Sequence, residues 1–292
     1  MIGRFLSRLL AAQDRWATPL GNFNVRVLRA IFRPIRPLKD FLNGKWLGHS
    51  IHAAMTDLPI GALSLTILFD ILNLRTAADI SLIVGILAMV GAAVAGLADY
   101  SDTDDDARTA ATVHAVLMTS ALVIYLISLA LRLGDPSADR AVPIALSIIA
   151  YLIVNAGAWV GGEVVYVMGN MVNRHAWRFF GEAKWQKLDL SEIPEGVPTA
   201  AKAGTQNVVV VRQGEHVYAL HATCAHAGGP LAEGRFVDGC VECPLHYSRF
   251  DVRTGRRTQG PTTFDQPRYE VRAADGGGWE LRRDGGTRGQ NF

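Results

Sequence analysis

Apolar residues dominate the middle of the chain, from about residue 55 to residue 168, and form four nearly uninterrupted segments. The segments cover residues 58–74, 80–97, 110–133 and 142–167. Each is close to the ~20 residues that a helix needs to cross the hydrocarbon core of a bilayer. A helix is required there because lipid cannot satisfy exposed backbone groups. The pattern therefore predicts four transmembrane helices.

The first 48 residues mix basic and apolar positions at helical intervals. The basic residues are Arg4, Arg8, Arg15, Arg26, Arg29, Arg33, Arg36, Lys39 and Lys45. Only Asp14 and Asp40 oppose them. This composition is typical of amphipathic helices that lie on an anionic membrane surface. The alternative is a basic arm that packs on its own protein.

After residue 198 the pattern changes to short β-rich runs separated by Gly- and Asp-rich turns. These runs cover residues 206–212, 216–220, 235–237, 269–272 and 279–282. We therefore predict a multidomain chain, with an all-α four-helix transmembrane bundle followed by a small all-β domain. The expected divisions are a basic arm (1–48), a transmembrane domain (49–175), a linker (176–198), a β domain (199–284) and a flexible tail (285–292).

Composition restricts the partners and the disulfide bonds that the chain can have. Hydrophobic residues make up 49% of the 292, and the formal net charge is only +2, with no nucleic-acid-binding motif, so we expect no nucleic-acid partner. Of the three Cys, Cys224 and Cys243 belong to a single motif, which leaves Cys240 without a partner for a disulfide. We interpret Cys240 as a small buried residue, and a low Cys count fits a reducing compartment.

The motif reads Cys224-Ala-His226, then sixteen residues, then Cys243-Pro-Leu-His246. Two Cys and two His are the ligands of a Rieske-type [2Fe–2S] cluster, in which the His bind one iron. Zinc also accepts this set and is the alternative. The usual zinc spacing, however, groups Cys with Cys and His with His in each half. Here each half contains one of each, which favours the iron–sulfur cluster.

Residues 224–231 and 239–251 resemble the two cluster loops of the Rieske family, and the resemblance extends from about Trp185 to Arg283. It implies that Cys224 and Cys243 bind one iron and that His226 and His246 bind the other. High-potential members also carry a disulfide between the loops. The matching positions here are Gly229 and Leu245, so the chain is more similar to Rieske ferredoxins and to the electron-entry domains of oxygenases.

The same resemblance implies which residues surround the cluster. We expect Gly229, Pro244, Leu245 and Ser248 to lie next to it. Ser248 matches a hydroxyl that bonds to a cluster sulfur in high-potential members, whereas Phe250 stands where those members have Tyr. This combination predicts an intermediate reduction potential. The alternative is that Ser248 is only a turn residue.

Residues 44–61 resemble the entry to an uncharacterised bacterial four-helix membrane domain, and residues 161–166 resemble its last-helix motif; the resemblance covers about Leu42 to Asn173. Within it, His52 and His114 lie near the same end of parallel spans. Two imidazoles at similar depth are suitable axial ligands for a b-type haem. We favour the other interpretation, in which His52 anchors its helix at the headgroups and His114 bonds another helix, so that haem is the alternative.

Basic residues near the ends of the spans predict the orientation. The arm and the stretch that contains Arg174, Arg178, Lys184 and Lys187 are both positive. We therefore expect an inner-membrane protein of a bacterium with both termini and the Rieske domain in the cytoplasm. Asp57, Asp70 and Glu163 should face the bundle or the interface; a quinone site is an alternative role for them.

No residue constellation for substrate chemistry is visible, so we assign no catalytic residues. We expect a one-electron carrier, bound to the lipid bilayer, that connects a cytoplasmic donor to a membrane or oxygenase partner. The redox partner would be a reductase, an oxygenase or a respiratory-type complex. The alternative is a redox-responsive scaffold, whose cluster senses the redox state and carries no electron flux.

Overall fold

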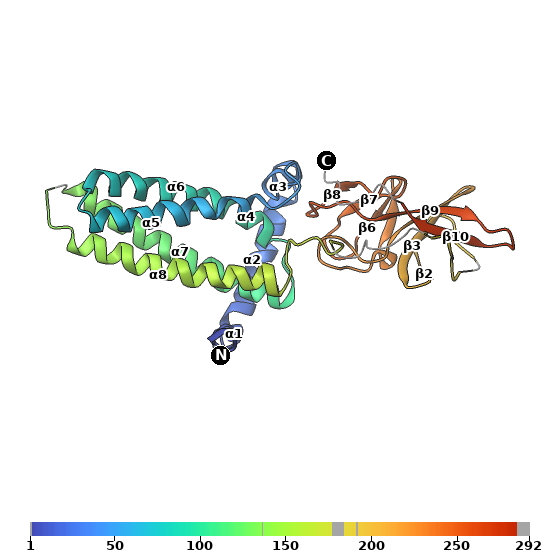
Figure 1. The fold of residues 1–292 in the computed structure, drawn as a ribbon, viewed down its shortest axis with the longest axis horizontal. Helices are drawn as coiled ribbons and strands as arrows, with labels where there is room; N and C mark the ends of the chain where they lie inside the picture. The colour runs from blue at the N-terminus through green and yellow to red at the C-terminus, as the bar shows by residue number, and fades with distance from the viewer. Residues whose placement is uncertain (1, 136, 177–183, 191, 285–292) are drawn as a thin grey trace. The chain divides into compact units, whose positions relative to one another are not determined.

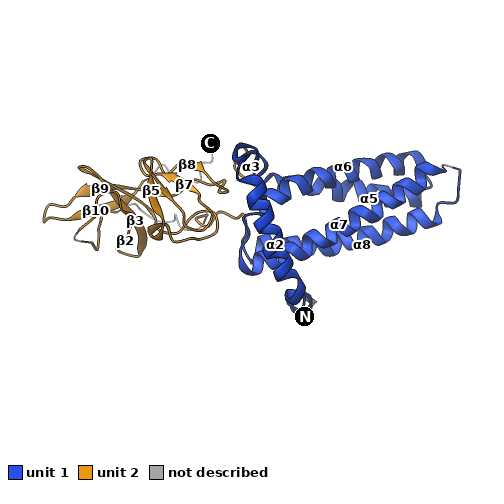
Figure 2. Ribbon diagram, turned by 180° about the vertical axis from the view of Figure 1, so that it is seen from behind, with its two compact units in different colours: residues 1–43, 50–170 blue, residues 44–49, 171–292 orange. Residues whose placement is uncertain are grey.

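The computed structural model describes residues 2–135, 137–176, 184–190 and 192–284. It divides into unit 1, Met1–Asn43 with Ser50–Asn170, and unit 2, Gly44–His49 with Met171–Phe292 (Figures 1 and 2). Three predicted features lie outside the described residues. They are the flexible tail at 285–292, Arg178, and residues 177–183 and 191 of the linker.

The secondary-structure elements in the described part of unit 1 are all helical. Its α-helices are α1 (Ile2–Ala11), α2 (Asp14–Phe32), α3 (Arg36–Leu42), α4 (Ile51–Met55), α5 (Asp57–Ile71), α6 (Arg75–Tyr100), α7 (Asp105–Gly134) and α8 (Ala141–Gly162). A π-helical turn, Glu163–Val167, continues α8. No strand is found among the described residues of this unit.

Four segments within the described residues are long and apolar enough to cross a membrane: Ile51–Ile71, Arg75–Tyr100, Asp105–Gly134 and Ala141–Val167. The prediction of four apolar spans is therefore confirmed. Polar residues extend some of the helices beyond the apolar segments. In α7 the first turn contains Asp105 and Asp106, whose charges favour the positive end of the helix dipole.

The four spans pack as two helical hairpins, α5 with α6 and α7 with α8, and fewer contacts join the two hairpins (Figure 1). The shared core consists of Leu63, Leu82, Ile86, Met89, Ala121, Tyr125, Ala150 and Val154. Gly85 allows α6 to approach α5, because a Cβ there would lie 2.6 Å from the Leu63 Cδ2 atom.

Charged side chains are buried at the end of the bundle where α5 finishes and α6 begins. Arg132 binds Asp70 at 2.6 Å, and these side chains are 0% and 2% exposed. Arg132 also lies 3.3 Å from Asp79, which binds Arg140 at 2.7 Å. Asp70 therefore faces the bundle, as expected for a carboxylate that is costly in lipid.

The basic arm packs on its own unit. In α2, the Arg29 Nε donates to the Ser101 carbonyl at 2.9 Å, and Thr18 bonds Thr109 at 3.0 Å. In α3, the Lys39 Nζ donates to the Asp102 carboxylate at 2.5 Å. The acidic loop between α6 and α7 thus pairs with the basic arm, which supports the second interpretation of the arm.

Unit 2 contains two antiparallel sheets. The larger has the order β1-β10-β9-β4-β3-β2, and the smaller has the order β5-β6-β7-β8. The strands are β1 (Gln186–Lys187), β2 (Thr199–Ala203), β3 (Gln206–Gln213), β4 (His216–His221), β5 (Arg235–Val237), β6 (Cys240–Glu242), β7 (Arg249–Asp251), β8 (Arg257–Gln259), β9 (Arg268–Ala273) and β10 (Trp279–Arg283). The prediction of an all-β domain is confirmed.

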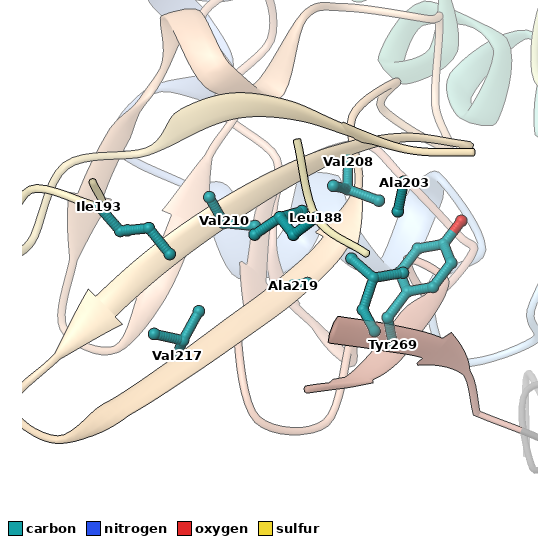
Figure 3. Packing of buried hydrophobic residues seen from close by; sticks show 9 residues of the cluster. Leu188, Ile193, Ala203, Val208, Val210, Val217, Ala219 and Tyr269 are labelled. Carbon is teal, nitrogen blue, oxygen red and sulfur yellow. The ribbon is translucent and has the colours of Figure 1, made fainter. Parts of the chain in front are cut away.

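Strand β3 is buried on both faces, and this explains its uninterrupted run of Val. Because side chains alternate along a strand, Val208 and Val210 enter one core, whereas Val209 and Val211 enter another. Figure 3 shows the first core, where Val208 and Val210 lie near Leu188. The second core lies against the smaller sheet and includes Cys224 and Cys243.

The predicted linker is partly sheet. Gln186 and Lys187 pair with Leu281 and Glu280 of β10, and Leu188 is 2% exposed in the first core. Residues 186–188 are therefore part of the domain, not a free connection. The sequence missed them because a two-residue strand has no periodicity of its own.

Candidate metal centre

The first candidate loop follows β4 and begins at Cys224. Its chain is bent into a tight turn, in which the Gly228 N–H donates to the Cys224 carbonyl at 3.0 Å. The Cys224 N–H in turn donates to the Gly229 carbonyl at 2.8 Å. Gly228 has φ +83°, a left-handed conformation that costs glycine little.

The second loop connects β6 to β7 and repeats this backbone arrangement. The Tyr247 N–H donates to the Cys243 carbonyl at 3.1 Å, and the Cys243 N–H donates to the Ser248 carbonyl at 2.8 Å. Tyr247 takes the left-handed position with φ +61°. The two loops are therefore equivalent, and each presents a Cys at its start and a His two or three residues later.

The four side chains meet in two like pairs. Cys224 and Cys243 share a hydrogen bond between their thiols. The rings of His226 and His246 have centroids 4.9 Å apart and lie nearly perpendicular, at 86°. The fold thus brings together residues that are far apart in sequence, with sulfur beside sulfur and imidazole beside imidazole.

All four side chains are buried, at 1% exposure for Cys224, 2% for Cys243 and His226, and 7% for His246. The two imidazoles therefore lie beneath the surface of the domain. The exposed side chains of the second loop are instead Leu245 at 46% and Tyr247 at 55%. The two loops fold inward on each other, so the flanking apolar residues form the surface.

Glycine permits two close approaches to the second loop. A Cβ on Gly229 would lie 2.8 Å from the Cys243 Sγ atom and 3.1 Å from Leu245. A Cβ on Gly260, which has φ +93°, would lie 2.5 Å from the Ser248 Cα atom. Side chains at these positions would push the second loop away from the first.

The environment favours a thiolate on Cys243. The hydrogen bond from Cys224 lowers the pKa of the Cys243 thiol to about 6, with the Leu245 and His246 N–H groups adding to the effect. The same hydrogen bond, together with burial, raises the pKa of Cys224 well above its ordinary value. A thiolate is the form in which Cys binds metal.

A buried ion-pair group supports the second loop from behind. Glu242 directly precedes Cys243 and binds Arg249 at 2.6 Å and Arg235 at 2.5 Å. Burial alone would raise the pKa of Glu242, but the hydrogen bonds from the two arginines outweigh it and lower the pKa. The carboxylate is therefore ionised and holds β5 and β7 against β6.

Gln266 holds the first loop, and sequence reasoning missed it. Its side chain is 1% exposed. The Nε2 donates to the carbonyls of His221 and Thr223, both at 2.7 Å, and the Oε1 accepts from the Ala225 N–H at 3.0 Å. His175 adds a 2.8 Å bond from its Nε2 to the Thr223 carbonyl. Gln266 lies far along the chain in a turn-rich segment, so no local signal identifies it.

The donor set fits a two-iron cluster better than a single ion. A Cys pair next to a His pair suits two irons with different ligands. The Ser248 Oγ adds a second indication, because it is 0% exposed and has no hydrogen-bond partner in the described part of the chain.

The remaining predicted residues lie as follows. Pro244 is half-buried beside Leu245 in the second loop. Cys240 is buried on β6, with its Sγ 3.5 Å from the Thr258 Oγ1 atom. In unit 1, His52 and His114 are neighbours, with ring centroids 6.0 Å apart.

Comparison with known proteins identifies a family for each half of the chain. Residues 175–270 match the family described as the Rieske [2Fe-2S] domain. Residues 48–174 match the family described as Predicted membrane protein (DUF2231). The two matches follow the order of the helical and β-sheet parts.

Curated relatives cover the C-terminal part. The ferredoxin subunit of anthranilate 1,2-dioxygenase from Burkholderia cepacia is 40% identical over 95 residues, which are 32% of this chain and 88% of the relative. The ferredoxin component of the naphthalene 1,2-dioxygenase/salicylate 5-hydroxylase systems from Ralstonia sp. is 34% identical over 84 residues, covering 28% and 80%. A solved structure, the ferredoxin of carbazole 1,9a-dioxygenase from Nocardioides aromaticivorans, is 35% identical and covers 35% of this chain and 98% of its own, with a TM-score of 0.31.

Proposed function

The chain belongs to the Rieske [2Fe–2S] family, and from this premise we propose that Cys224 and Cys243 bind one iron of the cluster while His226 and His246 bind the other. The observation that carries this assignment is the pairing of thiol with thiol and of imidazole with imidazole across two equivalent loops. A single zinc ion would require all four donors around one point.

The protein transfers electrons through this cluster, which supplies one-electron chemistry at a potential raised by the two imidazole ligands. The chain's own residues prepare the site. Burial of the four donors excludes water, and the backbone N–H groups of Leu245 and His246 stabilise negative charge on the Cys243 sulfur. We further propose that the buried Ser248 hydroxyl donates to a sulfur of the centre and raises its potential.

A redox partner protein follows from the relatives, which are ferredoxin subunits of dioxygenase systems. We propose that this chain performs the same kind of task, accepting an electron from a cytoplasmic reductase and delivering it to an oxygenase-type or membrane-bound acceptor. The exposed Leu245 and Tyr247 beside the buried imidazoles give such a partner an apolar contact. The chain itself would act as the electron-transfer component of such a system.

We also propose that the four apolar helices anchor the protein in a lipid bilayer. Large apolar side chains such as Leu87, Leu152 and Ile71 are 66%, 65% and 76% exposed along the spans, as lipid contact requires. The surplus of basic residues in the arm, and around Arg174 and Lys184, favours a cytoplasmic location for both termini.

The assignment of the ligands is tested on the full-length protein purified in detergent. The wild type should contain iron and acid-labile sulfide at two of each per chain, with an EPR signal on reduction. Cys224→Ser and Cys243→Ser should lose this signal. Cys240→Ser is the matched control, since Cys240 is also buried but lies outside the set, and it should retain the signal. Stoichiometric zinc in the wild type, or loss of the signal in the control alone, would overturn the assignment.

Membrane anchoring and orientation need a separate test. A reporter fused to the C-terminus, and the same reporter inserted at Ser137 between α7 and α8, should show opposite accessibility in sealed membrane vesicles. Recovery of the protein in the soluble fraction would contradict anchoring. Accessibility of the C-terminal reporter from the periplasmic side would contradict the orientation.

A further inference from the structure

Two histidines meet inside unit 1, in the membrane half of the chain. His52 lies in α4, at the start of the first span, and His114 lies in α7. Their ring centroids are 6.0 Å apart and their planes are almost perpendicular, at 82°. The Rieske centre and its family do not involve these residues, so their proximity requires a separate explanation.

Both imidazoles are oriented by the same kind of contact. The His52 Nδ1 donates to the Ala92 carbonyl on α6, and the His114 Nδ1 donates to the Gly157 carbonyl on α8, each at 2.8 Å. A neutral imidazole that donates from Nδ1 carries a lone pair on Nε2, and this is how a metal-binding His is typically held. In the described part of the chain, neither Nε2 has a hydrogen-bond partner.

Glycines on the second helix of each hairpin make room for the rings. A Cβ on Gly96 of α6 would lie 2.9 Å from the His52 ring, and a Cβ on Gly161 of α8 would lie 3.3 Å from the His114 ring. The arrangement is therefore repeated, since His52 of α4 lies against Gly96 of α6 and His114 of α7 lies against Gly161 of α8.

Methionines extend the same repeat. Met55, three residues after His52, packs 3.0 Å from the Cβ position of Gly91, and Met118, four residues after His114, packs 2.9 Å from that of Gly157. The α4–α6 pair and the α7–α8 hairpin thus contribute equivalent groups. Their imidazoles meet with ring centroids 6.0 Å apart.

From this geometry we propose that His52 and His114 are the two axial ligands of a b-type haem. The 6.0 Å centroid separation fits one metal placed between the rings, because each metal–nitrogen bond is about 2 Å long. No third Cys, His, Asp or Glu joins the pair within the described residues. A bare ion would lack ligands, whereas a porphyrin brings its own equatorial nitrogens and needs only two axial donors from the protein.

The test uses the full-length protein, produced with a supply of haem precursor and purified in detergent. The wild type should contain about one haem per chain by the pyridine haemochromogen assay, with a low-spin spectrum. His52→Gly and His114→Gly should each reduce the amount of bound haem per chain at least tenfold. His216→Gly, a matched control at an exposed histidine of β4, should keep it.

Added imidazole separates ligation from a structural role. It should restore the low-spin spectrum in His52→Gly and His114→Gly, because the free ligand replaces the missing side chain. The Cys224→Ser variant should keep its haem while losing the cluster, so failure of one proposal is distinguishable from failure of the other. Absence of haem from the wild type after titration with haemin, His-dependent binding of a bare metal ion, or haem that both His variants retain unchanged would overturn the proposal.

Discussion

Replacing Gln266 by Leu removes three hydrogen bonds that hold the first loop of the Rieske centre. The lost bonds join the side chain to the carbonyls of His221 and Thr223 and to the N–H of Ala225. A neutral hydrogen bond contributes about 1 kcal/mol net, so the free energy of unfolding of the domain should fall by about 3 kcal/mol. For a domain of this size such a loss lowers the melting temperature by roughly 10 °C.

The assay is thermal loss of the visible circular dichroism of the cluster in the purified full-length protein. Gln213→Leu is the matched control, because the Gln213 Oε1 is buried without a hydrogen-bond partner in the described residues. That change should cost less than about 0.5 kcal/mol. If Gln266→Leu melted within a degree or two of Gln213→Leu, the reasoning that Gln266 holds the loop would be refuted.

Three further predictions concern single contacts. Ser248→Ala should retain the cluster but lower its reduction potential by roughly 60 mV, equivalent to about 1.4 kcal/mol for one electron; an unchanged potential in a redox titration would exclude the hydrogen bond. Gly229→Ala should lower cluster occupancy, since its Cβ would lie 2.8 Å from the Cys243 sulfur and overpacking costs about 1–3 kcal/mol; wild-type iron content would contradict this. Arg132→Ala should destabilise the bundle by about 3–5 kcal/mol in detergent unfolding, because it leaves Asp70 buried and unpaired. The double variant Asp70→Ala/Arg132→Ala should be less damaged than the sum of the two single changes; strict additivity would count against coupling.

The sequence predicted the features that depend on local pattern. Each predicted span has its own run of apolar residues. The spacing of the two Cys and two His between Cys224 and His246 is likewise a local pattern, and it is typical of one kind of site. The run of Val in β3 likewise needs no partner to be recognised, because a strand buried on both faces is uniformly apolar.

What the sequence could not predict depends on contacts between distant segments. Strands β6 and β7 have three residues each, and they exist because the neighbouring strands pair with them. Gln266 reaches Ala225 across 41 positions. The acidic residue Asp102 reads as part of a solvated loop, yet it binds Lys39 of the arm. In each case a tertiary contact stabilises the feature, and the periodicity of the sequence does not reveal such a contact.

The proximity of His52 and His114 falls between these cases. Their place near one end of parallel spans is readable from the sequence, but the 6.0 Å separation depends on how the hairpins pack. In the sequence alone, the Gly residues of α6 and α8 are simply small residues of the kind that favour helix packing. Their positions opposite the two rings emerge from the fold.

The central claim, a two-iron centre bound by two Cys and two His, is tested most directly by pulsed EPR of the reduced full-length protein with ¹⁵N-labelled histidine. The account predicts two strongly coupled histidine nitrogens in the wild type and in Cys240→Ser. A reduced signal without coupled nitrogen, or a protein that holds only EPR-silent zinc at this site, would contradict it.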